Sequence, residues 1–222
     1  MRSIAIAILA LTLFTAACED PSANKARATV NEPLANRPAQ LASNSNNAPA
    51  PKGEVFAIDP GTSKIEFTGS KVTGRHEGGF NQFSGAIDLV DKKPAESSVH
   101  VYIDAASVFS DDEKLTGHLK SADFFDIEKF PKAAFTSTKI EPDTQAGVDS
   151  YTVTGDFTLH GVTKSVSFPA SIRVSESSVD VDSEFTINRK DFGIAYAGKA
   201  DDLIRDGVVI RLNLRSPKRN NQ

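Results

Sequence analysis

From residue 53 onward, apolar and polar residues alternate along the chain with a period of two. Residues 166–174, for example, place Val, Phe, Ala, Ile and Val at every second position, with mainly polar residues between them. This alternation is typical of antiparallel strands that bury one face and expose the other to water. It recurs in nine runs, at 54–58, 63–72, 82–90, 98–107, 132–141, 149–160, 164–175, 177–188 and 206–215. We therefore predict an all-β fold.

Turn residues separate these runs and favour direct connections between neighbouring strands. Gly, Pro, Asp or Ser clusters stand at 59–61, 91–94, 141–143, 160–161 and 175–178,. Several runs are near ten residues, or about 33 Å long at about 3.3 Å per residue. Long, sequentially connected antiparallel strands tend to close on themselves, because closure removes exposed edges. The expected architecture is an extended antiparallel, lipocalin-like β-barrel of about eight or nine strands.

One interruption of the period-two pattern predicts a helix. Between Asp111 and Pro131 the spacing changes, and Leu115 and Leu119 stand four residues apart. Ser110, Asp111 or Asp112 is suited to cap such a helix, because their side chains accept hydrogen bonds from its first N–H groups. The aromatic residues Phe124, Phe125 and Phe130 follow. We predict a short helical cover across one end of the barrel.

The first residues predict an export signal. Arg2 precedes an apolar run at 4–14, and small residues lead to Cys18. The run is shorter than the roughly 20 residues that span a bilayer, and its order of charge, apolar core and small residues is that of a secretory signal peptide over 1–17. A cysteine at this place resembles the lipobox of bacterial lipoproteins, in which the thiol is lipidated, although Thr15 replaces the usual aliphatic residue. The alternative is simple cleavage after Ala17, which leaves an unused thiol.

Residues 18–52 are mostly Ala, Asn, Pro and Ser. Such a segment lacks the apolar area that would offset the entropy of ordering it, so we predict a disordered tether with a reach of about 30–35 Å. The barrel domain would occupy residues 53–216, and 217–222 would be a flexible tail. Together with a lipidated Cys18, this predicts an exported, membrane-anchored lipoprotein on the periplasmic face.

Composition limits the partners. Lys and Arg number 25 against 29 Asp and Glu, a net charge of −4, which argues against a nucleic-acid partner. Membrane binding is expected through the N-terminal lipid anchor, because the acid excess lies in the barrel part. The single cysteine excludes a disulfide framework or a cysteine zinc site within the chain,. The aromatic content is dominated by 14 Phe, with no Trp.

Three motifs carry a family likeness. They are EKLTGHLKSADFFDIEKFP at 113–131, YTVTGDFTLHGVTK at 151–164 and INRKDFG at 187–193. With these three motifs in this order, the chain resembles the YceI-like family over about residues 54–215. The resemblance implies a lipocalin-like barrel in a periplasmic or secreted protein that binds polyisoprenoid lipids. The chain departs from the commoner pattern at 75–80 and 197–206, where we expect loops at the barrel mouths.

The resemblance and the phenylalanine content together predict an isoprenoid lipid as ligand. Phe offers a large apolar surface without a hydrogen-bonding group, which suits a hydrocarbon tail. The alternative is that these rings merely fill the core. The predicted ligand-binding residues of the interior and cover are Phe67, Val101, Ile103, Phe124, Phe125, Phe135, Phe157, Leu159, Phe168, Phe185, Ile187 and Phe192.

Polar residues at the mouth are candidates for holding the lipid head group. We select His118, Arg189 and Lys190, whose side chains carry donors for a phosphate or quinone oxygen. The alternatives are a helix residue for His118 and, for 188–191, a turn in which Asn and Asp side chains accept backbone N–H groups.

The sequence contains neither a metal-ligand spacing nor a catalytic motif such as GxSxG, a P-loop or GxGxxG,. We therefore predict a non-catalytic binding protein for a polyprenyl phosphate or quinone type of lipid, with no other cofactor. Two alternatives stay open: an envelope stress or interaction protein with a packed barrel, and a lipid- or quinone-dependent enzyme. The oligomeric state is not fixed by the sequence, and a dimer is one option.

Overall fold

The computed structural model describes residues 20–33 and 51–218. Its strands are β1 (Thr29–Asn31), β2 (Glu54–Ala57), β3 (Lys64–Lys71), β4 (Gly74–Phe80), β5 (Phe83–Leu89), β6 (Ser98–Asp104), β7 (Val108–Ser110), β8 (Lys132–Pro142), β9 (Ser150–Leu159), β10 (Val162–Val174), β11 (Ser178–Asn188), β12 (Gly198–Lys199), β13 (Asp202–Leu203) and β14 (Gly207–Pro217). The helices are α1 (Glu113–Leu119) and the 3-10 turns η3 (Pro94–Glu96), η4 (Ala105–Ser107) and η5 (Arg189–Phe192).

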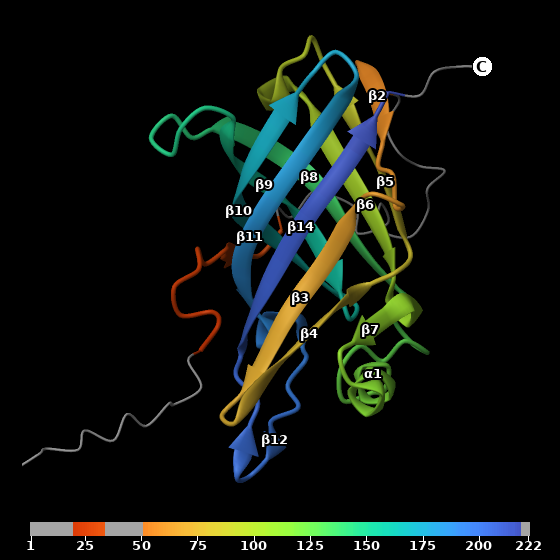
Figure 1. Cartoon of the computed structure of the whole chain (residues 1–222), viewed down its shortest axis with the longest axis vertical. Helices are drawn as coiled ribbons and strands as arrows, with labels where there is room; N and C mark the ends of the chain where they lie inside the picture. The colour runs from red at the N-terminus through yellow and green to blue at the C-terminus, as the bar shows by residue number, and fades with distance from the viewer. Residues whose placement is uncertain (1–19, 34–50, 219–222) are drawn as a thin grey trace, which may run out of the picture.

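The main sheet is antiparallel and curls into an extended barrel, as predicted (Figure 1). Its order is β2-β5-β6-β8-β9-β10-β11-β14-β3-β4-β7, with β1 paired to β10. One end of this order, β2, lies beside β14 near the upper end, where the Asp59 N–H donates to the Arg215 carbonyl at 2.8 Å. Each of the nine predicted runs is a strand of this wall, because one face of each is apolar and turns inward.

A tight turn joins β9 to β10 as the sequence predicted. His160 and Gly161 have φ values of 50° and 74°, the positive pair that a two-residue hairpin turn needs. A Cβ on Gly161 would lie 2.3 Å from the Phe130 ring. Gly161 is therefore required both by its backbone conformation and by the ring packed on it.

Residues 75–80 were predicted to be a loop, and this prediction is wrong. They belong to strand β4, which pairs with β3 on one side and with β7 on the other. Gly78 explains the departure from alternation, because a Cβ there would lie 2.3 Å from the Phe109 carbonyl oxygen and 2.6 Å from the Phe67 ring. The glycine lets three strands approach closely where a side chain would separate them.

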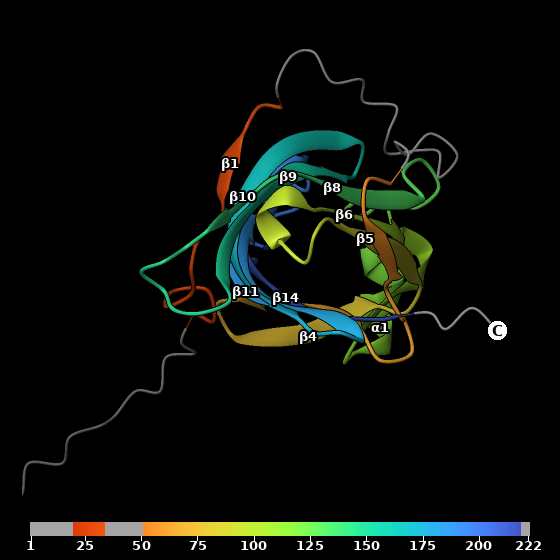
Figure 2. The same cartoon turned by 90° about the horizontal axis from the view of Figure 1, so that it is seen from above.

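Both ends of the barrel are covered. At the lower end in Figure 1 lie α1 and the two-stranded sheet β12-β13, which confirms the helical cover and places 197–206 at a mouth. At the upper end η3 lies across the opening, as the view from above shows (Figure 2). The sequence predicted only a turn at 91–94. Pro94, which starts η3, lines the interior.

The predicted disordered tether is wrong over residues 20–33. This segment lies on the outside of the barrel, and β1 within it pairs with β10. Lys52 is also held, because its N–H donates to Asp88 at 2.8 Å. At the other end β14 reaches Pro217, and the Lys218 N–H donates to the Ser177 carbonyl, so 217–218 are part of the fold and not of a tail. The predicted signal peptide 1–17, Cys18 and the remaining residues of the predicted tether and tail lie outside the described residues.

Candidate binding cavity

An apolar cavity of about 220 Å³ lies along the inside of the barrel. It reaches from Leu89 and Pro94 near η3 to Ile194 and Ile204 at the lower end. An engineered cavity of about 150 Å³ in another protein is large enough to bind benzene. The barrel interior is therefore not filled by its own side chains, and the alternative of a fully packed core does not describe it.

Eleven of the twelve residues predicted for the interior and cover line this cavity: Phe67, Val101, Ile103, Phe124, Phe125, Phe135, Phe157, Leu159, Phe168, Phe185 and Ile187. Phe192 does not. It is 0% exposed and packs behind Phe157, with ring centroids 5.2 Å apart. Phe192 is thus a core residue of the wall, and the prediction that it contacts a ligand is not supported by its position.

The phenylalanine rings form two groups along the cavity. In the middle of the wall Phe168 stacks on Phe185 with centroids 4.3 Å apart and planes at 10°, and Phe135 lies against Phe168 at 5.5 Å. At the lower end Phe125 meets Phe80 edge-on at 5.6 Å. Aromatic pairs in these arrangements are stabilising beyond their buried area, so the rings give the cavity fixed walls.

Sequence reasoning missed several lining residues. Phe80 was placed in a loop, and the aliphatic side chains between the rings were not selected. The latter lie at inward positions of the predicted strands, so the alternation was a sufficient signal for them: Val153, Val166, Ile172, Val179, Val181, Val208, Ile210, Leu212 and Leu214.

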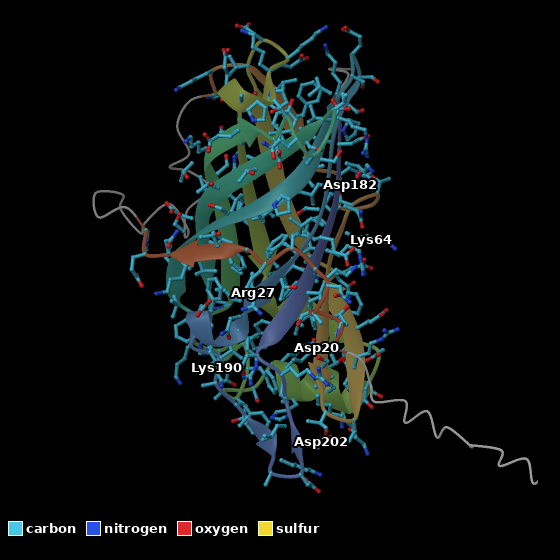
Figure 3. All side chains as sticks on the ribbon, turned by 90° about the vertical axis from the view of Figure 1, so that its left-hand side faces the viewer. Asp20, Arg27, Lys64, Asp182, Lys190 and Asp202 are labelled. Carbon is cyan, nitrogen blue, oxygen red and sulfur yellow. The ribbon has the colours of Figure 1, made fainter. Side chains whose placement is uncertain are left out.

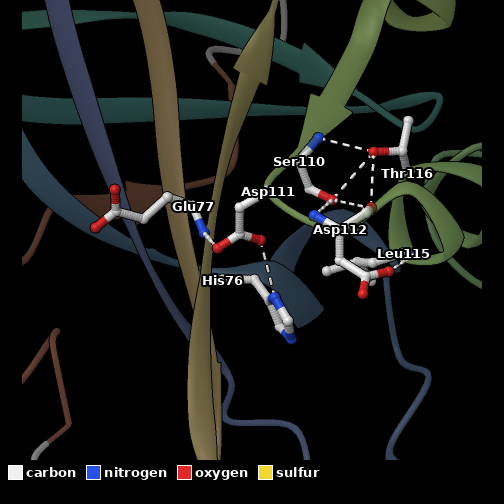
Figure 4. Close-up of polar contacts among 7 residues, drawn as sticks. All are labelled: His76, Glu77, Ser110, Asp111, Asp112, Leu115 and Thr116. Carbon is white, nitrogen blue, oxygen red and sulfur yellow. Dashed lines mark hydrogen bonds and ion pairs between the residues drawn. The ribbon is translucent and has the colours of Figure 1, made fainter.

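The helix α1 is fixed firmly at its start (Figure 4). Asp112 caps it, with Oδ1 accepting the Leu115 N–H at 2.8 Å. Thr116 Oγ1 accepts the Ser110 N–H at 2.9 Å and donates to the Asp112 carbonyl at 3.0 Å. Asp111 joins this end to β4, because the Asp111 N–H donates to the Glu77 carbonyl at 2.9 Å. The helix is therefore tied to β4 and β7 through backbone and side-chain bonds.

His118 lies on α1 as a cover residue. Its Nε2 is 2.7 Å from Asp123 Oδ2, and its ring meets Phe124 and Tyr196 edge-on at 4.9 and 5.1 Å. His118 is not among the residues that line the cavity. Its position is the one that the helix alternative predicted, so a head-group role has no direct geometric support.

Arg189 is buried, with 5% exposure, at the lower end of the cavity. Its guanidinium donates to the carbonyls of Ile194 at 2.7 Å, Arg205 at 3.1 Å and Ile204 at 3.3 Å, and to Asp206 at 3.2 Å. Burial lowers the pKa of Arg189, while the Asp206 carboxylate opposes that shift. These partners account for Arg189 without a ligand: it holds both ends of the 194–206 segment together beneath the cavity.

Lys190 is half-exposed and pairs at 2.9 Å with Asp206, the same carboxylate that accepts from Arg189. The turn alternative for 188–191 is correct, since Asn188 Oδ1 accepts the Lys190 N–H at 2.9 Å. Arg205 was not selected from the sequence, yet it lines the lower end of the cavity and pairs with Asp20 at 3.1 Å. Arg205 is thus the cationic residue best placed beside the lower mouth.

Within 20–33 and 51–218, no three His, Cys, Asp or Glu side chains gather closely enough to hold a metal ion. No helix in these same ranges combines the length and the apolarity needed to cross a bilayer.

Comparison with known proteins connects this cavity to a family. The YceI-like domain matches residues 56–216. A UPF0312 protein of Pseudomonas putida strain W619 is 35% identical over 127 residues, covering 54% of this chain and 65% of the relative. A UPF0312 protein of Photorhabdus laumondii is 40% identical over 95 residues, covering 43% and 47%. The matched segments thus span less than two thirds of these relatives.

Solved structures show the same fold. BcnA of Burkholderia cenocepacia is 26% identical, with a TM-score of 0.65 over 72% of this chain and 99% of that protein. A polyisoprenoid binding domain from Saccharophagus degradans gives a TM-score of 0.60 at 20% identity, covering 74% and 98%. The YceI protein of Campylobacter jejuni gives 0.52 at 25% identity, covering 64% and 85%. The similarity extends over most of the barrel.

Proposed function

Because the chain belongs to the YceI-like domain family, we propose that its barrel binds the hydrocarbon tail of an isoprenoid lipid without chemical conversion. The observation that carries this proposal is the cavity, whose volume is about 220 Å³ and whose walls are nearly all apolar side chains. Burial of apolar area at about 25 cal/mol per Å² would supply most of the affinity. The structurally similar domain from Saccharophagus degradans is described as polyisoprenoid binding, which supports this ligand class.

The size of the cavity sets the length of tail that fits. Scaling from the benzene-binding cavity of about 150 Å³, about nine carbon atoms would fit in the cavity as it stands, which is close to two isoprene units. A longer tail would require the walls to move apart or part of the tail to remain outside. We therefore expect affinity to rise steeply from one to two isoprene units and more slowly thereafter.

We place the polar head group at the lower mouth. Arg205 and Arg189 line the cavity there, whereas the upper end is lined by Leu89, Pro94 and Ser97 next to η3. A phosphate or a quinone oxygen would be favoured beside Arg205 by charge or hydrogen bonding. In this proposal the protein sequesters or carries a polyprenyl phosphate or quinone type of lipid in the bacterial cell envelope.

Membrane anchoring through Cys18 remains part of the proposal. An exported lipoprotein would hold the barrel near the bilayer from which its ligand comes. Two or more acyl chains, at about 0.8 kcal/mol per buried methylene, are needed for a persistent anchor. Cell fractionation tests this: the parent should be in the membrane fraction and Cys18→Ser in the soluble fraction, and an unchanged distribution would refute lipidation.

Lipid mass spectrometry of the purified protein tests the function itself. After delipidation and incubation with a mixture of prenols and fatty acids, we expect the protein to retain a prenol at near-equal molar amount. A protein that binds no prenol, or that takes fatty acids equally well, would overturn the proposal. The packed-barrel alternative predicts no retained lipid at all.

A further inference from the structure

The backbone ladder of the barrel wall has a long gap between β10 and β11. The two strands pair only from Val174 with Val179 to Ser171 with Asp182. Below this point β10 continues its ladder with β9, and β11 continues with β14. We call the interval between residues 162–170 of β10 and residues 183–188 of β11 the seam.

Pro169 explains why the seam begins where it does. In an antiparallel pair, a residue's N–H and C=O point to the same neighbouring strand. The Pro169 carbonyl points towards β11, because it accepts the Ser183 hydroxyl at 2.5 Å. Proline has no N–H to donate on that side. The backbone ladder therefore stops at Pro169, and the hydrogen bond from the Ser183 hydroxyl takes the place of one backbone hydrogen bond.

The N-terminal segment fills the seam from outside. We call residues 20–32 the arm. The Ala28 N–H donates to the Thr186 carbonyl of β11 at 2.9 Å, and the Thr186 N–H donates to the Ala26 carbonyl at 2.8 Å. Directly after this, β1 pairs with residues 165–167 of β10. Figure 3 shows the arm crossing the wall from Asp20 past Arg27 to β1.

The arm is also part of the apolar wall. Ala28 is 7% exposed and belongs to the core, and Val30 packs against the core opposite Val166. The residues on both sides of the seam line the cavity: Val166 and Phe168 from β10, Phe185 and Ile187 from β11. Removing the arm would therefore open the side of the cavity and not merely expose an outer surface.

The arm is held less firmly than the covers at the ends. It forms a ladder of three residue pairs and two further backbone bonds with the wall. Its ion pairs are partly exposed: Lys25 with Glu184 at 2.6 Å, Asp20 with Arg205 at 3.1 Å, and Glu32 with Lys164 of β10. Solvent-exposed pairs contribute at most about 1 kcal/mol each. By contrast, α1 is capped and tied to two strands, and Arg189 fastens the lower segment from within.

We propose that the arm is a removable strand of the barrel wall, and that its release opens the seam as a lateral entrance for the lipid tail. This proposal rests on the proposed function, because it describes how the same cavity is loaded. A side opening lets the tail move in sideways while the polar head group stays in water. Head-first threading from an end would bury a charged head group in an apolar cavity, which is costly. Tail-first threading would need one of the covered mouths to open.

A disulfide that fixes the arm tests this directly. Thr29 and Ser167 are directly opposed in an antiparallel pair, and Cα separations of about 4.5–5.5 Å in such pairs suit a disulfide. The arm lock is Thr29→Cys with Ser167→Cys, and the control lock is Thr158→Cys with Thr163→Cys, an opposed pair of β9 and β10 that leaves the arm untouched. All proteins carry Cys18→Ser, so that the introduced pair provides the only thiols.

The measurement is the rate of uptake of dansyl-labelled farnesol by stopped-flow fluorescence, with the equilibrium Kd measured on the same samples. We expect the oxidised arm lock to slow uptake at least tenfold with Kd within twofold of the parent. Reduction should restore the rate, and the control lock should match the parent in both states. Equal uptake rates for oxidised and reduced arm lock would overturn the lateral entrance while leaving the binding function intact. If the parent binds no probe, the binding function fails, and the lateral entrance falls with it.

A second pair of variants weakens the arm instead of fixing it. Val30→Ser should speed dissociation of the preloaded probe at least threefold, because it removes the apolar contact with Val166. Val148→Ser changes a valine that is 91% exposed and should leave the rate unchanged. Identical dissociation from both variants, with circular dichroism showing an intact barrel, would contradict the proposal.

Discussion

The upper and lower parts of the barrel wall are built differently. In the upper part β10 and β11 pair directly, and their ladder runs unbroken from the turn at 175–178 to Asp182. In the lower part β10 and β11 separate, and three added pieces complete the enclosure: the arm, α1 and the 189–206 segment. The upper β10-β11 wall is held by backbone pairing between the two strands, whereas the lower part depends on specific side-chain and arm contacts.

This difference implies that one part of the wall sets the stability of the barrel and the other part sets access to its cavity. Direct strand pairing makes the upper β10-β11 wall part of one cooperative sheet, so this wall should open only with global unfolding. Pieces that cover an opening can detach while the sheet remains folded. Under the proposed function we therefore expect ligand exchange at the lower wall, whereas the upper wall should keep the cavity in shape.

Phe185 stands where the two parts meet, and its truncation should give the largest effect. It is buried and stacks on Phe168 across the seam. Phe185→Ala should lower the free energy of unfolding by about 3–5 kcal/mol, measured by urea denaturation. Phe185→Leu, which retains most of the apolar volume, should cost clearly less, and equal losses for both variants would show that the stacked ring has no special role.

A substitution at Arg189 tests what holds the lower part together. Arg189→Met keeps the length and apolar stem but leaves the carbonyls of Ile194, Ile204 and Arg205 without this donor. Because buried acceptors that lose their donors are costly, we expect a loss of about 2–4 kcal/mol and faster amide exchange confined to 194–206. Lys190→Met, at an exposed ion pair, should cost no more than about 1 kcal/mol. Uniform acceleration of exchange across the barrel would contradict a local role for Arg189.

A substitution at Asp182 tests how much the ion pairs on the outer face of the upper part stabilise the protein. Burial would raise the pKa of this carboxyl, but hydrogen bonds from Asn213, Arg215 and Arg173 outweigh it and lower the pKa to about 2. A depressed folded-state pKa stabilises the protein above the unfolded value of about 3.8, and this contribution is lost as the pH falls towards 2. Asp182→Asn should therefore cost up to about 2 kcal/mol at pH 7, and the difference between parent and variant should shrink between pH 4 and 2. A difference that stays constant over this range would rule out the ionic contribution.

His100 should give the smallest effect. Burial lowers its pKa, and Asp88 only partly opposes that shift. Because the folded state disfavours the protonated ring, the contribution of His100 to stability is greatest above the unfolded pKa of about 6.5. This contribution falls as the pH drops below that value. His100→Gln should flatten the dependence of thermal stability between pH 7 and 5. An unchanged slope would assign that dependence to other groups.

The sequence predicts the upper part better than the lower part, for a physical reason. Strands with one buried face carry a period of two, so the nine runs and nine of the predicted cavity-lining side chains can be identified from the alternation. Phe124 and Phe125 follow α1 and are not part of that pattern. The cap of α1 is equally local, since Asp112 and Leu115 are three residues apart. β4 was missed because Gly78 serves a close approach of three chains, a tertiary requirement that hides the alternation.

The arm could not be predicted from its own composition. Its residues lack the apolar area to fold alone. Ala28 nevertheless becomes buried and Val30 partly buried, because β10 and β11, far away in the sequence, separate at Pro169 and leave a strand-sized gap. Likewise, Arg189 was selected for its charge, while its partners at 194 and 204–206 converge only in the folded chain. Contacts between distant segments decide these roles, and a single sequence does not display them.

The most direct test of the central claim is to fill the cavity from within. Val153 lines it from β9 and is buried. In a titration with dansyl-labelled farnesol, we predict one bound probe per parent chain. Val153→Phe should bind at least tenfold more weakly with the fold retained, because the added ring occupies the tail's space, and the exposed control Val148→Phe should bind like the parent. Unchanged affinity in a folded Val153→Phe protein would mean that the probe binds elsewhere, and the account of the barrel as a lipid-binding cavity would be wrong.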